Sequence, residues 1–355
     1  HCVFSFRYKR LITPAVPASA PGSSSAVPAA PGAPAATAAP TAQAAALKSA
    51  QRVHVKTDVL DVYIDTIGGD LRQVDLLTYP VKVDKPNEPV RLLTDAQADL
   101  FIAQSGLLSS RAAPDYQAQF SAEKIEYTLG ASGANEIKVP LSWTGPDGVT
   151  VTKIYTFHRG SYVVDVEQVV NNASMAEWKG RQYRQFQRRD SSDGGMSLIY
   201  TYTGGVIYSE AKKYEKIPFD DMAAENLSRD IPGGWAAMIQ HYFLGAWIPK
   251  AGEANHYYRQ VLDDKRSVLG LASPELVTAP AQAGTFSSRL FIGPKLQDTL
   301  EKVAPGLELT VDYGILTVLA KPLFWLLAWL HKMVGNWGWS IVLVTLMIKL
   351  VFFKL

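Results

Sequence analysis

The C-terminal part of the sequence carries its most constraining feature, an apolar run with a lysine inside it. The run covers Trp337 to Leu355 (WGWSIVLVTLMIKLVFFKL), close to the roughly 20 residues that cross a bilayer core as a helix. Lys349 lies about 14 Å along the axis from Ser340, near the bilayer centre, where an ionisable group costs about 2.5 to 3.5 kcal/mol. A charge at this depth predicts a functional role. Alternatively, Lys349 and Lys354 both lie at the inner rim and extend to the headgroups.

The segment before this run has the pattern of an amphipathic helix. We expect the helix at Lys321 to Val334, with Pro322 near its first turn. At about 100° per residue, Ala328, His331 and Lys332 fall opposite a broad apolar arc. Such a helix lies in the membrane interface, where tryptophan rings are favoured, although a buried core helix is an alternative. The arc consists of Leu323, Trp325, Leu326, Leu327, Trp329, Leu330, Met333 and Val334.

A short break separates the two apolar segments and favours the interfacial alternative. Gly335 and Gly338 allow a sharp turn from the membrane plane into the membrane normal, so we predict a hinge there. Trp337 and Trp339 are placed to anchor this corner at the headgroups.

The region from Gln51 to about Ser288 has the alternation of β-strands. Apolar and polar residues alternate in the segments 60–65 and 162–167. These signals predict a mainly β protein with an antiparallel sandwich, in a single domain of about 240 residues. A helix is expected next, at Pro294 to Val303, with Pro305 just beyond its end. The turn signals between the strands are Gly68-Gly69, Gly145-Pro146-Asp147-Gly148 and Gly204-Gly205.

Composition divides the chain into segments. Thr13 to Ala46 is almost wholly Ala, Pro, Ser, Gly and Thr, which cannot bury enough apolar surface to fold. Because the chain begins at His1 and ends within the apolar run, we expect a piece of a longer protein. The expected segments are a residual N-terminal segment at 1–12, a disordered Ala/Pro-rich linker at 13–50, a β-sandwich domain with a C-terminal helix at 51–310, an interfacial amphipathic helix and hinge at 311–336, and a membrane helix at 337–355.

Several chemistries find no support in the sequence. A net charge of +2 does not indicate nucleic acid as a partner, and the only cysteine, Cys2, excludes an internal disulfide. The six histidines are scattered without metal-ligand spacing, so we expect neither metal nor cofactor. No nucleophile elbow, zinc helix, phosphate loop or dinucleotide fingerprint is present. The adjacent carboxylates Asp220-Asp221 and Asp263-Asp264 are interpreted as turn or surface residues.

An aromatic cluster lies in the segment Gly233 to Pro249. Its Trp235, Tyr242, Phe243 and Trp247 either fill the core of the sandwich or line a sugar-binding cleft. Core filling is favoured because aromatic side chains dominate protein interiors.

Several ordered blocks together resemble the YidC family of bacterial membrane protein insertases, in its gram-negative form with a large periplasmic domain. The resemblance extends over about 52–355, and its most specific block is Gly335 to Ser340 (GNWGWS), followed by the charged span. The other blocks are Thr57 to Gly69 (TDVLDVYIDTIGG), Lys213 to Lys216 (KYEK) before Phe219, Gly233 to Pro249, and Phe291 to Gly314.

This resemblance implies a periplasmic β-supersandwich, similar to mutarotase-like sandwiches, followed by an interfacial helix and the first helix of the insertase core. It implies a multi-pass protein of the bacterial inner membrane that is not an enzyme. Such a protein inserts, folds and helps assemble integral membrane proteins, both alone and with the Sec translocon, through a charged groove. The implied partners are nascent membrane proteins, the translocon with SecD and SecF, and membrane lipids.

The resemblance also assigns the charged residue of the apolar run. Lys349 aligns with the groove charge, where gram-negative family members usually carry arginine, and Lys354 stands where a proline is usual. Lysine keeps the charge but loses the bidentate fork of a guanidinium.

Two further interpretations remain open at this point. One is a membrane-tethered carbohydrate-binding or carbohydrate-modifying module, which rests on the sandwich alone. His241, beside the aromatic cluster, is the one residue that favours it. The other makes the β domain a docking surface for Sec partners, which is compatible with an insertase.

Overall fold

The computed structural model describes residues 47–130, 133–189, 202–219, 222, 227–262, 266–311, 317–351 and 353. Some predictions concern residues outside these ranges. They are the N-terminal segment at 1–12, all but the last four residues of the linker at 13–50, the carboxylate pairs Asp220-Asp221 and Asp263-Asp264, residues 312–316 of the interfacial segment, and residues 352, 354 (Lys354) and 355 of the predicted membrane helix.

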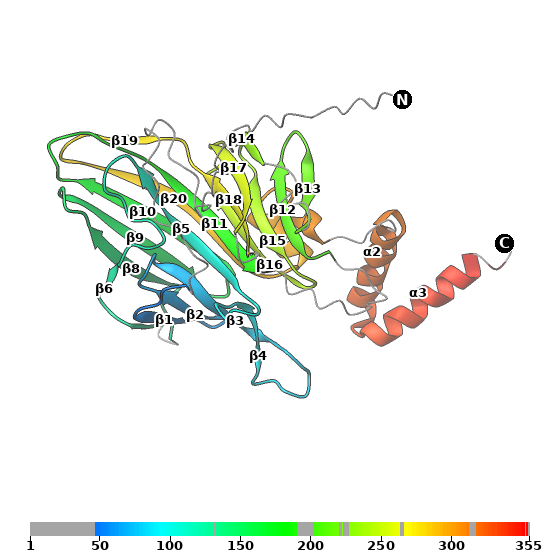
Figure 1. The fold of residues 1–355 in the computed structure, drawn as a ribbon. Coiled ribbons are helices and arrows are strands. Elements are labelled where there is room, and N and C mark those ends of the chain that lie inside the picture. Colours follow the sequence, from blue (N-terminus) through cyan, green and yellow to red (C-terminus); the bar gives the residue numbers. More distant parts are fainter. Residues whose placement is uncertain are drawn as a thin grey trace, which may run out of the picture.

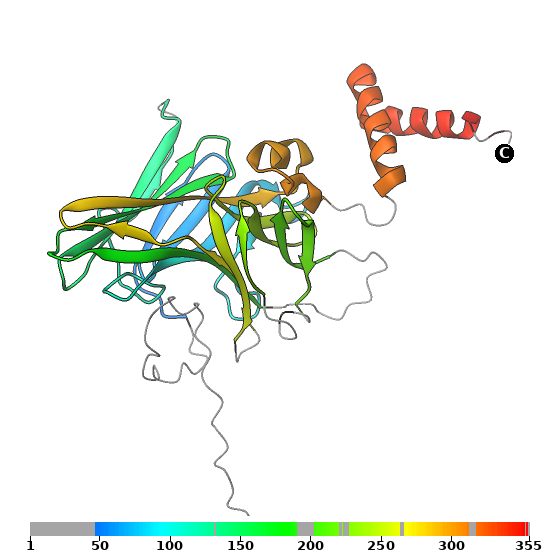
Figure 2. The ribbon, with the colours of Figure 1, turned by 90° about the horizontal axis from the view of Figure 1, so that it is seen from above.

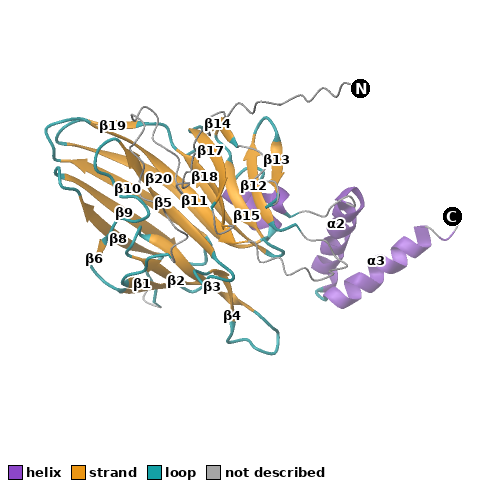
Figure 3. Ribbon diagram, in the orientation of Figure 1, coloured by secondary structure: helices purple, strands orange, loops and turns teal. Residues whose placement is uncertain are grey.

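Two large β-sheets form the body of the described chain, which confirms the prediction of a mainly β sandwich (Figures 1 and 3). One sheet has eleven strands in the order β14-β17-β18-β11-β5-β3-β2-β1-β7, with β19 beside β11 and β4 beside β3. The other has nine strands in the order β13-β12-β15-β16-β20-β10-β9-β8-β6. Neighbouring strands are antiparallel except β1 and β7, which run parallel.

The strands of the eleven-stranded sheet are β1 (Arg52–Lys56), β2 (Leu60–Asp65), β3 (Asp70–Pro80), β4 (Pro89–Leu93), β5 (Phe101–Ser109), β7 (Glu126–Thr128), β11 (Trp178–Arg189), β14 (Ser228–Pro232), β17 (Ala254–Val261), β18 (Arg266–Ala272) and β19 (Leu276–Thr278). Those of the nine-stranded sheet are β6 (Ser121–Ala122), β8 (Glu136–Thr144), β9 (Val149–His158), β10 (Val163–Asn172), β12 (Gly204–Ser209), β13 (Lys213–Ile217), β15 (Trp235–Ile239), β16 (Phe243–Pro249) and β20 (Gln282–Pro294).

The main core lies between the two sheets. Strand β2 buries Val62 and Ile64, and strand β20 of the other sheet buries Leu290 in the same cluster. Alternation along each strand places these residues on the inner face, because successive side chains of a strand point to opposite faces. The aromatic residues Trp247 and Phe186 fill the space between them, with ring centroids 6.1 Å apart.

A second apolar cluster covers part of the outer face of the nine-stranded sheet. Helix α1 (Gln297–Val303) and the short 3₁₀ helix η2 (Leu307–Thr310) pack there (Figure 2). Leu300 of α1 is fully buried, and the indole of Trp235 donates a hydrogen bond to the Pro305 carbonyl at 3.0 Å. Trp235 and Trp247 therefore serve the cores, as expected, whereas Tyr242 is exposed.

The helix prediction after the strands was wrong at its start. Pro294 is the last residue of β20 instead of lying in the first turn of α1, because β20 continues its pairing with β16 through Phe243. The expected end near Val303 is confirmed.

Two turn signals are confirmed and one is wrong. Gly68 and Gly69, both with positive φ, join β2 to β3, and the 145–148 turn joins β8 to β9. Gly204 and Gly205 instead lie buried inside β12. A Cβ atom on Gly205 would lie 2.7 Å from the Met222 methyl carbon, so close packing explains this glycine, not a turn.

The predicted alternation at 60–65 holds except at its end. Asp65 is fully buried, although its position in the pattern assigns it to the polar side. Its carboxylate accepts hydrogen bonds from the Ser49 hydroxyl, from Ala50 N at 3.1 Å and from Ile67 N at 2.8 Å. These donors compensate the cost of burying the charge.

Helices α2 (Thr317–Val334) and α3 (Trp337–Val351) pack against each other at one end of the molecule (Figures 1 and 2). The amphipathic helix was expected from Lys321, but it begins at Thr317, so Pro322 lies inside it. Proline there removes one backbone hydrogen bond without ending the helix. Over the part of the chain that the structure describes, no helix combines the length and apolar character that crossing a membrane requires.

Candidate functional site

The helical pair exposes large apolar side chains on both helices. Apolar side chains that gather on one exposed unit mark a contact with lipid or with another protein. The helical pair is therefore the first part of the candidate site. On α2 these side chains are Leu323, Phe324, Trp325, Trp329, Met333 and Val334, and on α3 they are Trp337, Trp339, Ile341, Val342, Leu346, Met347, Leu350 and Val351.

The two tryptophans of α2 share one exposed face. Trp325 is 70% and Trp329 47% exposed, and their spacing of four residues places them one above the other. Lys332, three residues further on, is also exposed and borders the same face. Tryptophans beside a cation are the composition of a helix at the lipid headgroups. Leu330, on another side of α2, is buried.

Helix α2 ends just before Gly335, one of the two residues predicted as a hinge, and the turn into α3 depends on a residue that sequence reasoning missed. Gly335 has φ +68°, and its N–H donates to the His331 carbonyl at 2.8 Å, which ends α2. The Asn336 carboxamide then accepts hydrogen bonds from Gly338 N at 2.9 Å and Trp339 N at 3.3 Å. Asn336 is thus the N-cap of α3, and an asparagine before an apolar helical run is the signal that could have identified it.

Gly338 does not share the conformation of Gly335. It lies in the first turn of α3 and has no positive φ. A Cβ at Gly338 would lie 3.2 Å from the Asn336 side-chain oxygen, so this glycine leaves room for the N-cap.

His331 occupies a different environment from the polar side expected for it. It is half-buried, and its ring stacks on Trp337 with centroids 3.8 Å apart and planes 10° apart. The stack joins the last turn of α2 to the first residue of α3.

Lys349 lies in the last turn of α3 and is exposed. It lies twelve residues beyond Trp337, which is about 18 Å along a helix axis. Its ammonium forms no ion pair with any residue of the described ranges. The hinge residues and Lys349 are therefore held on one short unit, with the hinge at one end and the charge near the other.

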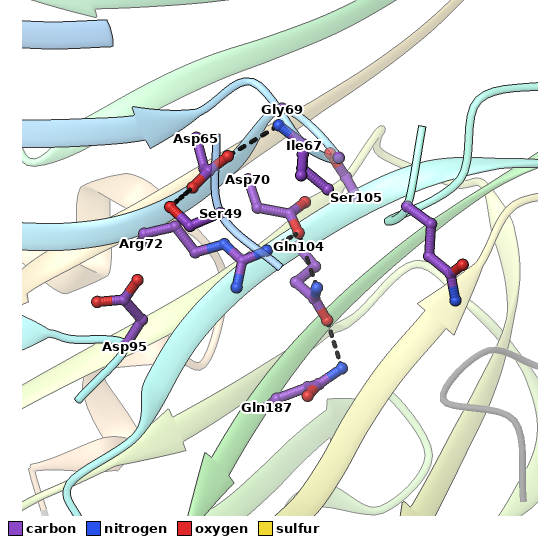
Figure 4. A network of polar contacts seen from close by, with 12 residues as sticks. Ser49, Asp65, Ile67, Gly69, Asp70, Arg72, Asp95, Gln104, Ser105 and Gln187 are labelled. Carbon is purple, nitrogen blue, oxygen red and sulfur yellow. Dashed lines mark hydrogen bonds and ion pairs between the residues drawn. The ribbon is translucent and has the colours of Figure 1, made fainter. Parts of the chain in front are cut away.

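A network of buried polar side chains lies on the eleven-stranded sheet, on the face opposite the main core, and apart from the helical pair (Figure 4). The Asp70 carboxylate accepts a hydrogen bond from the Gln104 amide at 2.7 Å, and Gln104 accepts one from Gln187 at 2.6 Å. Arg72 lies 3.6 Å from Asp70. Burial raises the pKa of Asp70, while the charges of Arg72 and Lys153 oppose that shift. Because Asp70, Gln104 and Gln187 are almost fully buried, they have no access to a solute, and their role is to tie β3, β5 and β11 together.

Lys153 ties the two sheets together. It lies on β9 of the nine-stranded sheet, and its ammonium donates to the carbonyls of Gly68 at 2.7 Å and Ser105 at 2.6 Å in the other sheet. It is 1% exposed, and burial lowers its pKa to about 8, although the Asp70 charge acts in the opposite direction.

A shallow groove of about 430 Å³ crosses the outer face of the nine-stranded sheet. One row of directly paired residues crosses its floor. His158 lies at the side of the groove. Its Nε2 is 2.7 Å from an Asp165 carboxylate oxygen, and its Nδ1 is 3.9 Å from a Glu136 carboxylate oxygen. The row runs from β8 to β16 through Lys138, Thr156, Asp165, Arg289 and Ile248.

This groove lacks the character of a sugar site. None of its described lining residues is Phe, Tyr or Trp, so it offers no aromatic face on which a sugar ring could stack. His241, the residue that favoured a carbohydrate module, is exposed beside Tyr242 with ring centroids 4.0 Å apart and is not among the groove residues.

Most of this chain matches one known family of proteins. Residues 52–326 match the family model described as the YidC periplasmic domain. The fold and the match together define a periplasmic β-sandwich domain that continues into helices with exposed apolar faces. The chain belongs to the YidC family.

Several curated relatives carry the name membrane protein insertase YidC. The Methylococcus capsulatus protein is 50% identical over 316 residues, covering 88% of this chain and 58% of its own length. The Thioalkalivibrio sulfidiphilus protein is 47% identical, with 88% and 57% covered. The Stutzerimonas stutzeri protein is 40% identical, with 96% and 62% covered. The chain thus spans less than two thirds of the length of these relatives.

Solved structures match this chain only at low similarity. A galactose mutarotase-like protein from Lactobacillus casei has a TM-score of 0.45 and 7% identity, covering 68% of this chain and 99% of its own. A galactose mutarotase related enzyme from Lactobacillus acidophilus has a TM-score of 0.43 and 8% identity, with 68% and 97% covered. At this level of similarity neither protein bears on the function of this chain.

Proposed function

We propose that the protein containing this chain is a membrane protein insertase and chaperone of the bacterial inner membrane. The observation that carries the proposal is the identity of 50% over 88% of the chain to a relative named membrane protein insertase. In this proposal the protein catalyses no covalent reaction. It lowers the cost of moving polar segments of a nascent membrane protein into the bilayer.

Lys349 supplies the charge for this task. Polar groups without partners in hydrocarbon cost several kcal/mol, so an uncharged bilayer opposes the entry of an acidic loop or tail. A cation on α3 that no described carboxylate neutralises attracts such a segment and offsets part of that cost. The incoming helix then moves sideways into lipid. In the complete protein, α3 continues as the first helix of a groove that further helices complete.

The rest of the chain positions this helix. The exposed Trp325 and Trp329, with Lys332, place α2 in the outer headgroup layer, where indole rings and cations are both favoured. The sandwich then lies in the periplasm. We further propose that the protein works both alone and beside the Sec translocon, and that SecD and SecF are among the partners that contact the periplasmic domain.

Complementation of a bacterial strain depleted of its own insertase tests the proposal. The parent gene is supplied as wild type, Lys349→Ala or Lys349→Arg, and insertion of client proteins is scored by protease protection. Wild type and Lys349→Arg are expected to restore insertion, whereas Lys349→Ala is not, because only the first two carry the charge. Insertion at the wild-type rate by Lys349→Ala would remove the role of the charge. Failure of a stably expressed wild type would remove the insertase function itself.

A further inference from the structure

An aromatic contact crosses the hinge between α2 and α3. The imidazole of His331 and the indole of Trp337 are nearly parallel, with 3.8 Å between their centroids. His331 belongs to the last turn of α2 and Trp337 is the first residue of α3, so the contact joins two helices that are separated only by Gly335 and Asn336.

The backbone around this contact is fixed from both sides. Gly335 N–H closes α2 onto the carbonyl of His331, the residue whose ring forms the stack. Asn336 opens α3 through its side-chain bonds to Gly338 and Trp339. The left-handed conformation of Gly335 leaves the direction of α3 dependent on a single residue, and a Cβ placed there meets no atom within 4 Å. Backbone crowding at Gly335 therefore does not set that direction. Side-chain contacts between α2 and α3 must set it, and the His331–Trp337 stack is the one that crosses the hinge itself.

The stack buries a polar atom without a hydrogen bond, which a contact between two apolar side chains would not do. His331 Nδ1 is buried and has no hydrogen-bond partner among the described residues. Leaving a polar atom unsatisfied lowers stability. The two rings therefore stack although the buried nitrogen lowers stability. A phenyl ring stacked at the same position would not carry that cost.

We infer that the His331–Trp337 stack is a clamp that sets the angle between α2 and α3 and so positions Lys349. This inference rests on the proposed function, because it concerns how the charge is presented. Lys349 lies about 18 Å from the hinge, so a change of about 10° in the direction of α3 moves its position by about 3 Å. His331 and Trp337 are positioning residues, and neither contacts the incoming protein in this proposal.

Distance measurement between the helices tests the clamp directly. Spin labels are attached at Phe324→Cys on α2 and Leu346→Cys on α3, both exposed, in a chain whose only cysteine is replaced by Cys2→Ser. The labelled chain is reconstituted in lipid nanodiscs. His331→Ala is expected to broaden the distance distribution and lower the clamped population about fivefold, the factor that an aromatic pair contributes. His331→Phe is the matched control and is expected to keep the narrow distribution.

Insertion by the full-length parent protein provides the second measurement. His331→Ala is expected to slow client insertion while expression stays normal, and His331→Phe is expected to restore the wild-type rate. An unchanged distance distribution in His331→Ala overturns the clamp. A broadened distribution with normal insertion overturns its positioning role. If Lys349→Ala also inserts normally, the proposed groove charge fails separately, and the distance measurement still decides the clamp.

Discussion

Replacing Lys153 with methionine is expected to remove an alkaline rise in the stability of the sandwich. The ammonium of Lys153 is almost fully buried between the sheets, held by backbone carbonyls that include those of Gly68 and Ser105. Burial lowers its pKa from 10.5 to about 8 in the folded chain. Between these two values the unfolded chain binds more protons than the folded chain, so the free energy of unfolding increases with pH.

The size of this rise follows from the two pKa values. Proton linkage for a group with a pKa of 10.5 unfolded and about 8 folded adds about 2 kcal/mol of stability from about pH 7 to about pH 9.5. The range ends at about pH 9.5 so that ionisation of the buried tyrosines contributes little to the measured change in stability. Burial raises the pKa of Tyr155 and Tyr258 above the ordinary value of 10.0, so they lower stability only at higher pH.

Denaturant unfolding at a series of pH values, followed by tryptophan fluorescence, measures this rise. The buried indoles of Trp178, Trp235 and Trp247 report on the cores. The wild-type chain is expected to gain the stated stability and Lys153→Met to lack the gain. Lys138→Met, which removes an exposed lysine from the adjacent strand, is the matched control and is expected to behave as wild type. An equal alkaline rise in wild type and Lys153→Met would refute the reasoning.

Three further outcomes are expected. Leu300→Ala should destabilise the chain by about 2 to 5 kcal/mol, because Leu300 is fully buried between α1 and the sheet; a loss below about 1 kcal/mol in denaturant unfolding would contradict this packing. Asn336→Ala should cost about 1 kcal/mol and speed amide exchange at Gly338 and Trp339, whereas Asn336→Asp should keep their protection. Trp325→Ala should reduce the fraction of the chain that sediments with lipid vesicles. An unchanged fraction would contradict the interfacial role of Trp325.

The strands were predictable because their signal is local. Alternation at 60–65 follows from the two-residue period of a strand, and the sequence therefore identifies the inner residues Val62 and Ile64 without knowledge of their partners. The same holds for α2, whose helical period and tryptophans were visible in the sequence, although its first residue was not.

Parts of the candidate site were proposed from residue type and position in the sequence alone, and their roles stay predictions. Lys349 was identified by its charge inside an apolar run, and Trp325 and Trp329 by their place before it. The stack of His331 on Trp337 was not predictable, because it depends on the direction in which the chain leaves Gly335.

The sequence by itself determined the mainly β class, the amphipathic helix and the charged apolar run, because period and composition are properties of neighbouring residues. Only the tertiary structure decided which glycines make turns and which allow close packing, as Gly68 and Gly205 illustrate. It also decided that Lys153 and Asp70 are buried beside each other. Such environments arise from strands distant in the chain, and their register sets which polar groups meet partners and which groups lose water.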